Sequence, residues 1–495
     1  RQPFPMAQYR QRVNVVWFKN NDLRVHDHEP LALAHQHKLP VLHVFVFDPF
    51  WFGRTRHGRF PKTGSFRAQF LVESVQDLRQ NLANLNQNLC VRSGQSTAEV
   101  FQQLTAEFDI TKVFAYSETL FEEQAIESEV RQVLKARSPG TQLRTVWGTT
   151  LYHLDDLPFD PSTAFPKSFT SFRQRVERSA SVRPTGYEWG QADVRLQPPP
   201  KAPAQAQTSF WGPMPDLPDL GVPTPVPDKR IQLATKGGET AGLQRLQQWL
   251  WETKGLSKYV GTTDWGTPAK CSLGPDSTTK LSPWLAHGCL SVRLVYQEVV
   301  RYEALCGRTK FSALLIRELI WRDFHKLGTI AWGNDLFKIK GPCGWGNGLT
   351  WVRNDDLLQR WINGATGYPF VDAHMRELKA TGYTLHLGRE VVAWFMTSDL
   401  RLDWRLGAEW FESVLVDYDC ALNWGNWVYF VLQQAASRQA RASAPTTLAT
   451  TEVLQWGAEH DPKAAFTKKW VPEVQHLTAT DAREPWGAVC RTHQV

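Results

Sequence analysis

The chain has 495 residues, which is enough for two large cores and too many for one ordinary domain. Its net charge of +7 and pI near 9.0 favour contact with polyanions such as nucleic acid, although a basic surface without such a partner explains the charge equally well. The seven Cys are scattered without CxxC spacing, which argues against a disulfide framework or a zinc site and for an intracellular reducing compartment. The sequence contains no run of 18 apolar residues, so we predict no transmembrane helix.

The N-terminal part, residues 13–150, alternates short apolar runs with amphipathic stretches. The apolar runs are rich in β-branched and aromatic residues and show little polar alternation, which predicts a buried parallel sheet. The alternation of strands and helices predicts a doubly wound α/β domain, while the absence of GxGxxG after the first run argues against a dehydrogenase-type dinucleotide site. The predicted strands are 13–18, 41–48, 89–94, 112–118 and 143–148, and the predicted helices are 64–86, 97–108 and 121–137.

Residues 151–238 are predicted to form a long Pro-rich connector. Ten Pro fall between Pro198 and Pro227, and such a segment cannot sustain a helix. From 239 to 475 the pattern is helical with few strand signals, for example at 242–254, 292–305 and 311–327, and predicts one large all-α domain. Residues 443–495 lose periodicity, and 476–495 are predicted to be a C-terminal tail.

The segment STTKLSPWLAHG (277–288) concentrates hydroxyl groups at the start of a predicted helix. Ser282 followed by Pro283 is typical of an N-cap and first turn. Thr278, Thr279 and Ser282, beside Lys280 and Leu281, could cradle a phosphate. An ordinary helix cap is the alternative interpretation.

Two further groups combine acids with aromatic or basic residues in helical surroundings. Glu318 and Trp321, in RELIWRDF, lie three positions apart and therefore on one helical face, where they could hydrogen-bond and stack a base. Arg389, Asp417 and Asp419 fall in apolar sequence, where charges are rare unless paired. A structural salt bridge and an exposed acid beside a core Trp are the alternatives.

The chain contains 22 Trp, an unusually large number for this rare residue, and most are expected to be core residues. The His26/His28 and His35/His37 pairs have spacing that can suit a metal, but no Cys or carboxylate cluster accompanies them, and we predict no metal site.

Several motifs together resemble the photolyase/cryptochrome family, and in particular the DASH cryptochromes. They are WFKNNDLRVHDHEPL, FPKTGSFRAQFLVESVQDLR, WGTTLYHLDDLPF, FTSFR, RELIWRDF, TGYPFVDAHMREL, DWRLG and DYDCALNWGNW, which together span roughly residues 13–435. The resemblance implies a FAD-binding helical domain and an N-terminal antenna domain bordering a folate, methenyltetrahydrofolate. Glu118 in YSETLFEE is the candidate folate contact, and an exposed acid after a strand is the alternative.

By this resemblance, the segment from Thr278 to Ser282 holds the flavin diphosphate together with Tyr259. The family spacing between these elements is shorter, which indicates an insertion around Asp264–Cys271. Arg389 would pair with Asp417 near the reactive edge of the flavin, and Asp419 would bind the imide side of the ring.

The resemblance also assigns the remaining site residues. Asn423 matches a family Asn in the flavin site. Trp427, Trp404 and Trp351 match the electron-transfer chain, with Trp427 nearest the flavin, and core packing is the alternative. Glu318 and Trp321 match residues that face the damaged pyrimidine pair in photolyases.

The chain departs from the family pattern near the flavin. His386 replaces the Asn that contacts flavin N5, and its imidazole could exchange a proton there at near-neutral pH. Leu387 replaces the Arg that reaches toward the DNA lesion, and VYFVLQQAASRQARASAPTT replaces a Gly-rich loop after Trp427. These changes should spare FAD binding and weaken DNA repair.

We therefore expect a blue-light-absorbing DASH-like FAD flavoprotein that acts as a photoreceptor, with an unknown signalling protein partner and weak, largely non-specific DNA binding. The first alternative is a light-driven cyclobutane pyrimidine dimer photolyase, a lyase, acting on single-stranded or looped DNA. The second is a flavin or nucleotide-binding protein without photochemistry. The chain begins at Arg1, so a targeting peptide could have been removed, and the nucleus and an organelle both stay open as compartments.

Overall fold

The fold is known from a computed structural model that describes residues 10–186, 196–203, 209–231, 235–259, 278–441 and 450–486. The five strands are β1 (Arg12–Phe18), β2 (Val41–Phe47), β3 (Leu89–Ser93), β4 (Asp109–Tyr116) and β5 (Gln142–Val146). The helices of the N-terminal half are α1 (Glu29–Gln36), α2 (Ser65–Asn84), α3 (Thr97–Glu107), α4 (Phe121–Arg137) and α5 (Phe169–Ser179). The later helices are α6 (Glu239–Gln247), α7 (Ser282–Ala286), α8 (Val292–Cys306), α9 (Lys310–Trp332), α10 (Asp355–Asn363), α11 (Pro369–Thr381), α12 (His386–Trp394), α13 (Trp404–Val414), α14 (Cys420–Arg441), α15 (Thr450–His460), α16 (Ala465–Trp470) and α17 (Ala479–Arg483).

All five strands form one parallel sheet in the order β3-β2-β1-β4-β5. This confirms the predicted doubly wound α/β class, and every strand lies where the apolar runs predicted it. The strand order reverses between β1 and β4, and an open parallel sheet binds ligands beyond the carboxyl ends of its strands at such a switch point. The residues after Phe18 and after Tyr116 therefore mark a candidate ligand position.

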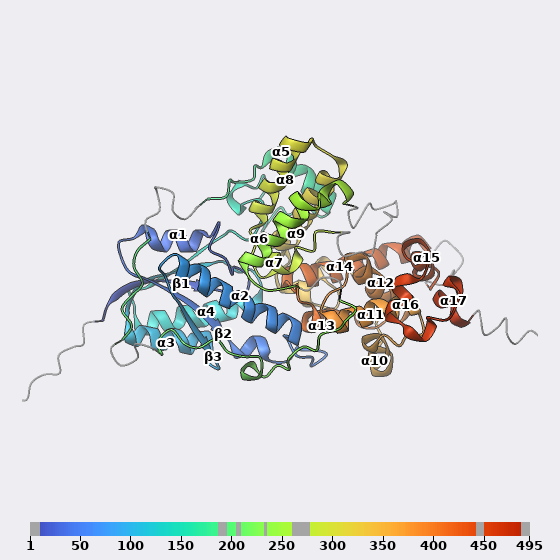
Figure 1. The fold of residues 1–495 in the computed structure, drawn as a ribbon, viewed down its shortest axis with the longest axis horizontal. Coiled ribbons are helices and arrows are strands. Elements are labelled where there is room, and N and C mark those ends of the chain that lie inside the picture. The colour runs from blue at the N-terminus through green and yellow to red at the C-terminus, as the bar shows by residue number, and fades with distance from the viewer. Residues whose placement is uncertain are drawn as a thin grey trace, which may run out of the picture.

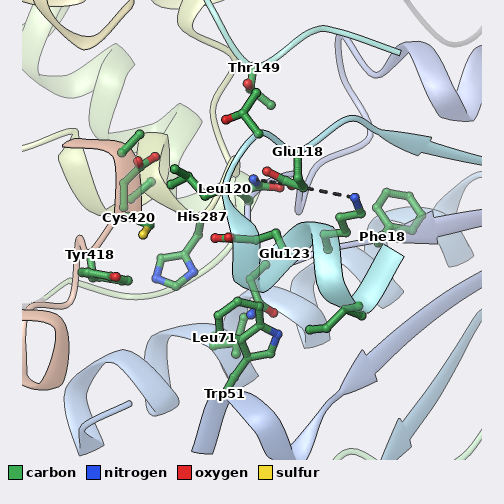
Figure 2. A pocket seen from close by; sticks show the side chains of 18 of the residues that line it. Phe18, Trp51, Leu71, Glu118, Leu120, Glu123, Thr149, His287, Tyr418 and Cys420 are labelled. Atoms are coloured by element: carbon green, nitrogen blue, oxygen red, sulfur yellow. Dashed lines mark hydrogen bonds and ion pairs between the residues drawn. The ribbon is translucent and has the colours of Figure 1, made fainter. Parts of the chain in front are cut away.

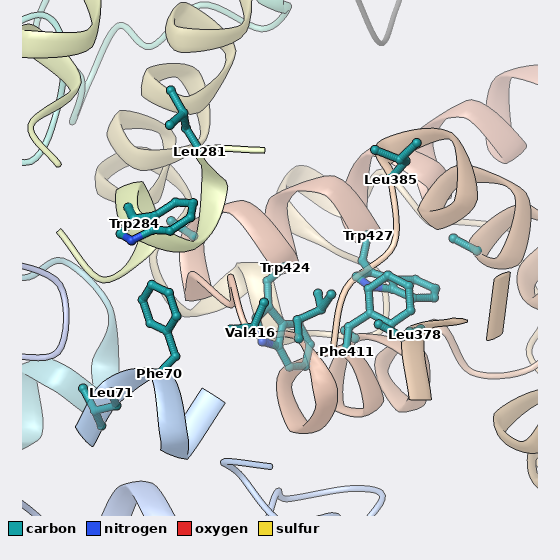
Figure 3. Packing of buried hydrophobic residues seen from close by; sticks show 14 of the residues in the cluster. Phe70, Leu71, Leu281, Trp284, Leu378, Leu385, Phe411, Val416, Trp424 and Trp427 are labelled. Atoms are coloured by element: carbon teal, nitrogen blue, oxygen red, sulfur yellow. The ribbon is translucent and has the colours of Figure 1, made fainter. Parts of the chain in front are cut away.

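The two faces of the sheet belong to different cores, as the period-two geometry of a strand allows. Val13, Val15 and Trp17 of β1 pack under α3 and α4. Val16 and Phe18 pack with α1 and α2 into a core that continues into the helical domain. In Figure 3 the ring of Phe70 on α2 points toward Trp284, with the ring centroids 5.9 Å apart, and the same core includes Trp424 and Trp427. The helical domain is therefore seated against one face of the α/β domain (Figure 1).

The predicted connector runs along the sheet rather than away from it. Pro198 accepts a hydrogen bond at its carbonyl from the Val41 amide (3.1 Å), and the Trp211 carbonyl accepts one from the Val91 amide (2.9 Å). Helix α5 lies within this stretch and packs against α9. The fixed boundaries 151–238 stay a prediction, and parts of the stretch lie outside the described residues.

The C-terminal region predicted to lack periodicity contains α15, α16 and α17. All three pack against α11. Their apolar residues, for example Val453, Phe466 and Ala482, belong to the main core. Helix α17 extends the packed region into the predicted tail.

One buried ion pair fastens α8 to the α/β domain. Asp27 accepts hydrogen bonds from Nη2 (2.7 Å) and Nε (3.1 Å) of Arg293, and its side chain is 1% exposed. Nearby, Gly288 has φ +64, and a Cβ there would lie 1.9 Å from the Asn21 carbonyl oxygen. The backbones of the two domains therefore approach closely where this ion pair holds them.

We predict that Arg293→Leu lowers the free energy of unfolding by about 3–5 kcal/mol, because it leaves the Asp27 carboxylate buried and unpaired. Chemical denaturation measures this. The control is Arg301→Leu on the same helix, whose partner Glu298 lies 3.5 Å away and whose side chain is 67% exposed; it should cost less than about 1 kcal/mol. Equal effects of both changes would contradict the assigned role of the buried pair.

Candidate functional site

Most of the predicted site residues line one cavity of about 490 Å³ in the helical domain. Its wall is formed by α5, the segment before α7, α9, the segment before α12, and the start of α14. The lining includes the predicted residues Thr278, Thr279, Lys280, Leu281, Ser282, Glu318, Trp321, His386, Arg389, Asp417, Asp419, Asn423 and Trp427. Sequence segments that lie as far apart as Phe169 and Phe430 thus build a single chamber, which we call the flavin-type cavity.

The hydroxyl-rich segment lies along one wall, but its capping geometry differs from the prediction. Helix α7 begins at Ser282, and Leu281 occupies the N-cap position, so Ser282 is not the cap. Thr279 instead accepts a hydrogen bond at Oγ1 from the Leu281 amide (3.3 Å), and its carbonyl binds Arg245. The backbone of Lys280 adopts φ +51, which turns the chain along the cavity. The insertion around Asp264–Cys271 lies outside the described residues.

Arg389 and Asp417 form the predicted ion pair. Nη2 of Arg389 lies 2.7 and 2.9 Å from the two carboxylate oxygens, and the Asp417 side chain is 2% exposed. Nε of Arg389 donates to the Thr384 carbonyl (3.0 Å), which fixes the guanidinium. Burial opposes the charged form, yet Asp417 and Tyr383 raise the pKa of Arg389, so it stays charged. The pair presents a fixed cation and a carboxylate to the cavity.

Asp419 is held from behind by a residue that the sequence analysis missed. Nζ of Lys326 lies 2.6 Å from Oδ2 of Asp419. Burial opposes ionisation, but Lys326 and Arg322 lower the pKa of Asp419 and keep it an acceptor. Lys326 and Arg322 follow Glu318 at intervals of four along α9, which was a signal for one functional face.

The other polar residues of the wall are oriented by specific bonds. Asn423 donates from Nδ2 to the Ala408 carbonyl (2.9 Å). The Tyr259 hydroxyl is buried behind the wall and donates to Glu318. Tyr259 thus orients a cavity carboxylate in this structure, and its predicted contact with a diphosphate stays a prediction.

Trp321 is half-buried and enclosed by rings from three elements. Its centroid lies 4.7 Å from Phe169, 4.8 Å from His325 and 5.4 Å from Tyr429. Its indole N–H donates to Oδ1 of Asn426 (3.3 Å). Tyr429 and Asn426 lie on α14, which continues as helix to Arg441 where the sequence departs from the family loop. The first half of α14 therefore packs against Trp321, with the Tyr429 ring at 85° to the indole.

The three predicted electron-transfer residues lie on α13 or against it. Trp427 lines the cavity and is 1% exposed, Trp404 is fully buried, and Trp351 is half-buried. A Cβ at Gly407 would lie 2.3 Å from the Trp427 ring, so this glycine lets Trp427 rest against α13, one turn from Trp404. Trp351 is brought beside the start of α13 by the backbone bond from the Val352 amide to the Arg401 carbonyl (2.7 Å).

His386 and Leu387, the two departures from the family pattern near the predicted flavin N5, lie in different surroundings. His386 lines the cavity, and its Nε2 lies 3.2 Å from Oε1 of Glu390, one turn along α12. Burial opposes protonation, but Glu390 and Glu318 outweigh burial and Arg389 and raise the pKa of His386. Leu387 is 7% exposed and belongs to the core. The side chain at 387 therefore packs away from the cavity.

A smaller cavity of about 140 Å³ lies at the switch point of the sheet, between the two domains. Glu118 lies on its wall, accepts from Nδ2 of Asn21 (2.9 Å), and lies 3.9 Å from Nζ of Lys19 (Figure 2). Glu123 also lines it, has a buried Oε2 without a hydrogen-bond partner among the described residues, and has a pKa raised by burial to about 8. Glu123, which the sequence analysis missed in the run FEE, is thus the group better placed to accept a new polar partner.

The four histidines of the HxH pairs lie in separate contacts. His26 pairs with Glu239, and His28 with Asp22 (3.2 Å). His35 lies 3.3 Å from His43, and His37 lies near Lys112. Among the described residues, no three potential ligands gather to hold a metal ion.

Comparison with known proteins gives the family. Residues 14–199 match the family described as DNA photolyase, and residues 315–495 match the FAD binding domain of DNA photolyase. Cryptochrome DASH from Gloeobacter violaceus is 40% identical over 95% of this chain and 88% of its own length. The chain belongs to the photolyase/cryptochrome family. The Cryptochrome DASH of Xenopus laevis is 36% identical (95% and 85% coverage), and the chloroplastic/mitochondrial one of Arabidopsis thaliana is 37% identical (94% and 76%).

Solved structures agree with this assignment. The Synechocystis cryptochrome superimposes with a TM-score of 0.85 at 35% identity, covering 97% of this chain and 92% of its own. A Sulfolobus tokodaii photolyase with two FAD molecules has the same fold, with a TM-score of 0.70 at 21% identity over 96% and 94% of the two chains.

The helical domain therefore binds FAD, and the cavity fits that cofactor. Hydroxyls and Lys280 at one wall suit a diphosphate. The Arg389–Asp417 pair and Asp419 supply the donors and acceptors that a buried polar ring edge requires.

In the part of the chain that the structure describes, no helix has the length and apolar character that a bilayer span requires.

We predict that the His386–Glu390 pair stabilises the fold in acid and not in base. The folded pKa of His386 lies above 6.5, so the stabilisation is complete below pH 6.5 and is lost as the pH rises through the folded pKa. Glu390→Gln should therefore lower the free energy of unfolding by about 0.5 kcal/mol near pH 5.5 and by much less above about pH 8. A loss that is constant across this range would show that the pair carries no charge.

Proposed function

We propose that the chain is a blue-light photoreceptor in which Trp427, Trp404 and Trp351 pass an electron inward to the excited flavin. The bound FAD supplies the light absorption and the electron acceptor. The observation that carries the proposal is the placement of the three indoles, with Trp427 on the cavity wall, Trp404 buried on α13 and Trp351 half-buried beside the start of α13. Electron supply from outside needs a partly exposed last donor, because that donor must reach an external reductant.

His386 gives the proposed flavin site a proton-exchanging group. Its imidazole lies on the cavity wall, and Glu390, Glu318 and Arg389 set its charge. A group that titrates near neutral pH can donate a proton or a hydrogen bond as the charge at the flavin changes. We therefore infer that photoreduction in this chain depends on pH.

DNA binding belongs to the proposal as a weak, largely non-specific interaction. Arg173 and Arg317 line the cavity beside Trp321, and the chain is basic overall. Phosphate contacts of this kind give affinity without sequence selectivity. We also propose that the chain acts on a signalling protein partner inside a reducing compartment of the cell. The chloroplastic/mitochondrial Arabidopsis relative supports an organelle as one candidate compartment.

The second candidate function is light-driven repair of cyclobutane pyrimidine dimers, in single-stranded or looped DNA. It is favoured by Glu318 and Trp321 on the cavity wall. A flipped lesion must offset the cost of leaving the stack by contacts in the pocket. Tyr429, Phe169 and His325 surround Trp321 at interplanar angles of 85°, 77° and 83°, which narrows the space for a stacked base. We therefore rank repair below photoreception.

The switch-point cavity is the proposed antenna site, with methenyltetrahydrofolate as the candidate chromophore. Glu118 is already bound to Asn21, whereas Glu123 has an oxygen available on the same wall. The cavity of about 140 Å³ requires side chains to move before a pterin enters. Folate in the purified protein that disappears in Glu123→Leu, but persists in the exposed-site control Glu129→Leu, would support this site.

We predict that Trp427→Phe retains FAD and loses most of its photoreduction by blue light. Phe is similar in shape, so packing is largely kept, but it is far harder to oxidise. The matched control is Trp361→Phe, because Trp361 is fully buried and lies 6.4 Å from Trp427 but lies outside the proposed path. Time-resolved absorbance after a blue flash measures both variants. Unchanged photoreduction kinetics in Trp427→Phe would contradict the assigned electron-transfer path.

We predict salt-sensitive binding to DNA with little preference for dimer-containing substrates, and slow or absent repair even with reduced flavin. Arg173→Gln should weaken binding to damaged and undamaged DNA alike and reduce the slope of log affinity against log salt by about 1. Binding and repair are measured on single-stranded and duplex substrates. Efficient repair by the unmodified chain would make it a photolyase. An Arg at position 387 is a poor test, because that side chain would be buried in the core.

A further inference from the structure

A second line of indole rings leaves the flavin-type cavity along α9. Trp321 lines the cavity, and Trp332 is the last residue of the same helix. Trp345 follows the short turn Pro342–Gly344. Trp332 is buried and Trp345 is half-buried. A cavity-lining indole, a buried one and a half-buried one thus occur here as they do in the path through Trp427, but on different elements of the fold.

The rings between these indoles are in contact with one another. The centroid of Trp321 lies 4.8 Å from His325 and 5.9 Å from Phe324, and both of these rings pack on Trp332, at 6.2 and 5.6 Å. Trp332 and Trp345 lie 5.9 Å apart at an interplanar angle of 75°. Centroid spacings of about 4.5–7 Å are those of packed aromatic pairs. Trp321 and Trp332 are therefore separated by no more than the two short steps through His325.

A glycine on α9 lets the ring of Trp332 fold back toward the cavity. A Cβ at Gly328 would lie 2.5 Å from this ring, one helical turn away. Side chains on a helix lean toward its N-terminus, so the ring at 332 passes over position 328 to reach His325 and Phe324. The contact between Trp332 and the rings nearer the cavity therefore depends on the missing side chain at 328.

The surroundings of Trp321 suit an indole that loses an electron and regains it. Burial lowers the pKa of His325 to about 3, so its neutral imidazole places no positive charge between the two indoles. Lys326, the next residue, is paired with Asp419 (2.6 Å). The indole N–H of Trp321 donates to the amide oxygen of Asn426 (3.3 Å), which is too weak a base to remove the proton. An oxidised Trp321 would therefore keep its proton and accept an electron from a neighbouring ring.

We propose that Trp321, Trp332 and Trp345 form a second electron-supply route to the flavin, beside the path through Trp427. This inference rests on the photoreduction proposed above and adds a second set of donors to it. Trp321 gives one electron to the photoexcited FAD and takes one from Trp332, which takes one from Trp345. Phe324 and His325 bridge the gap without being oxidised, because both rings are harder to oxidise than an indole. The half-buried Trp345 releases its indole proton to water, and it regains an electron and a proton from an external thiol.

The test starts from full-length, FAD-loaded Trp427→Phe, because this change closes the first path. We expect a slower photoreduction that persists in this variant. A second readout is a nitroso spin trap present during blue illumination, with tandem mass spectrometry of the digested protein to locate the trapped radical; we expect the adduct at Trp345. Adding Trp332→Phe should remove most of the remaining photoreduction and of this adduct. The control is Tyr429→Phe in the same background. Its ring also contacts Trp321 (5.4 Å) but belongs to α14, so both readouts should stay unchanged.

A further variant separates the route from an effect on the fold. Trp345 is half-buried, so Trp345→Phe disturbs the core less than a change at the buried Trp332. In the Trp427→Phe background it should remove the adduct and slow the remaining photoreduction, at unchanged FAD content and melting temperature. The second route is overturned if the remaining photoreduction survives Trp332→Phe unchanged, or if Tyr429→Phe removes it. Absence of photoreduction from Trp427→Phe alone would overturn only the second route, whereas its absence from the unmodified chain would overturn the proposed photoreception as well.

Discussion

The buried ion pair between Arg389 and Asp417 is the interaction on which the cavity depends. It ties α12 to the short segment that precedes α14. The pair fixes the backbone at Asp417, two residues before Asp419. Asp419, Asn423 and Trp427 are spaced four residues apart, so they share one face at the start of α14. Removing one partner of a buried pair costs about 3–5 kcal/mol, whereas a well-packed apolar pair would often cost nothing. A pair kept at this position is better explained by a polar ligand than by stability.

The opposite wall is organised by the same spacing. Glu318, Arg322 and Lys326 follow at intervals of four on α9, and Lys326 reaches Asp419 on the other wall. Ala286, Tyr418 and Asp419 border both the flavin-type cavity and the switch-point cavity, so Asp419 is the carboxylate of the wall that the two chambers share. A charge change in either chamber therefore acts on the same ion pair. The seating of the helical domain on one face of the sheet brings both chambers together at this wall.

Sequence reasoning predicted the parts whose signal is local. The five strands could be predicted because each is a buried apolar run, and α8 and α9 because their spacing is strongly helical. Helices α15, α16 and α17 could not, because they are short and owe their stability to packing on α11. The start of α7 differs from the prediction by one residue, since Ser282 is its first residue and Leu281, which precedes it, has no side-chain cap to offer.

Among the site residues, too, those with a local sequence signal were predicted and those that depend on distant segments were not. Arg389, Asp417 and Trp427 were found because their motifs are contiguous and similar to family motifs. Lys326 and Glu123 were missed because their significance lies in partners or cavities formed by distant segments. Leu387 shows the limit of carrying a role over by position, because its side chain packs into the core instead of the cavity.

The enclosure of Trp321 shifts the balance between the two candidate functions. Family resemblance alone gives Glu318 and Trp321 the same meaning in a repair enzyme and in a photoreceptor. The rings of Tyr429 and Phe169 stand at steep angles to Trp321 (85° and 77°) and narrow the space around it, which favours the proposed photoreceptor over repair. Helix α14 runs to Arg441 through the sequence that departs from the family pattern after Trp427.

The most direct test of the central claim is the visible absorption spectrum of the purified chain, recorded before and after blue light without oxygen and with an external reductant. The account predicts bands of bound oxidised flavin that bleach under light and return when oxygen is admitted. A spectrum without flavin bands would contradict the assignment of the cavity, and flavin bands that light leaves unchanged would contradict the proposed photoreduction.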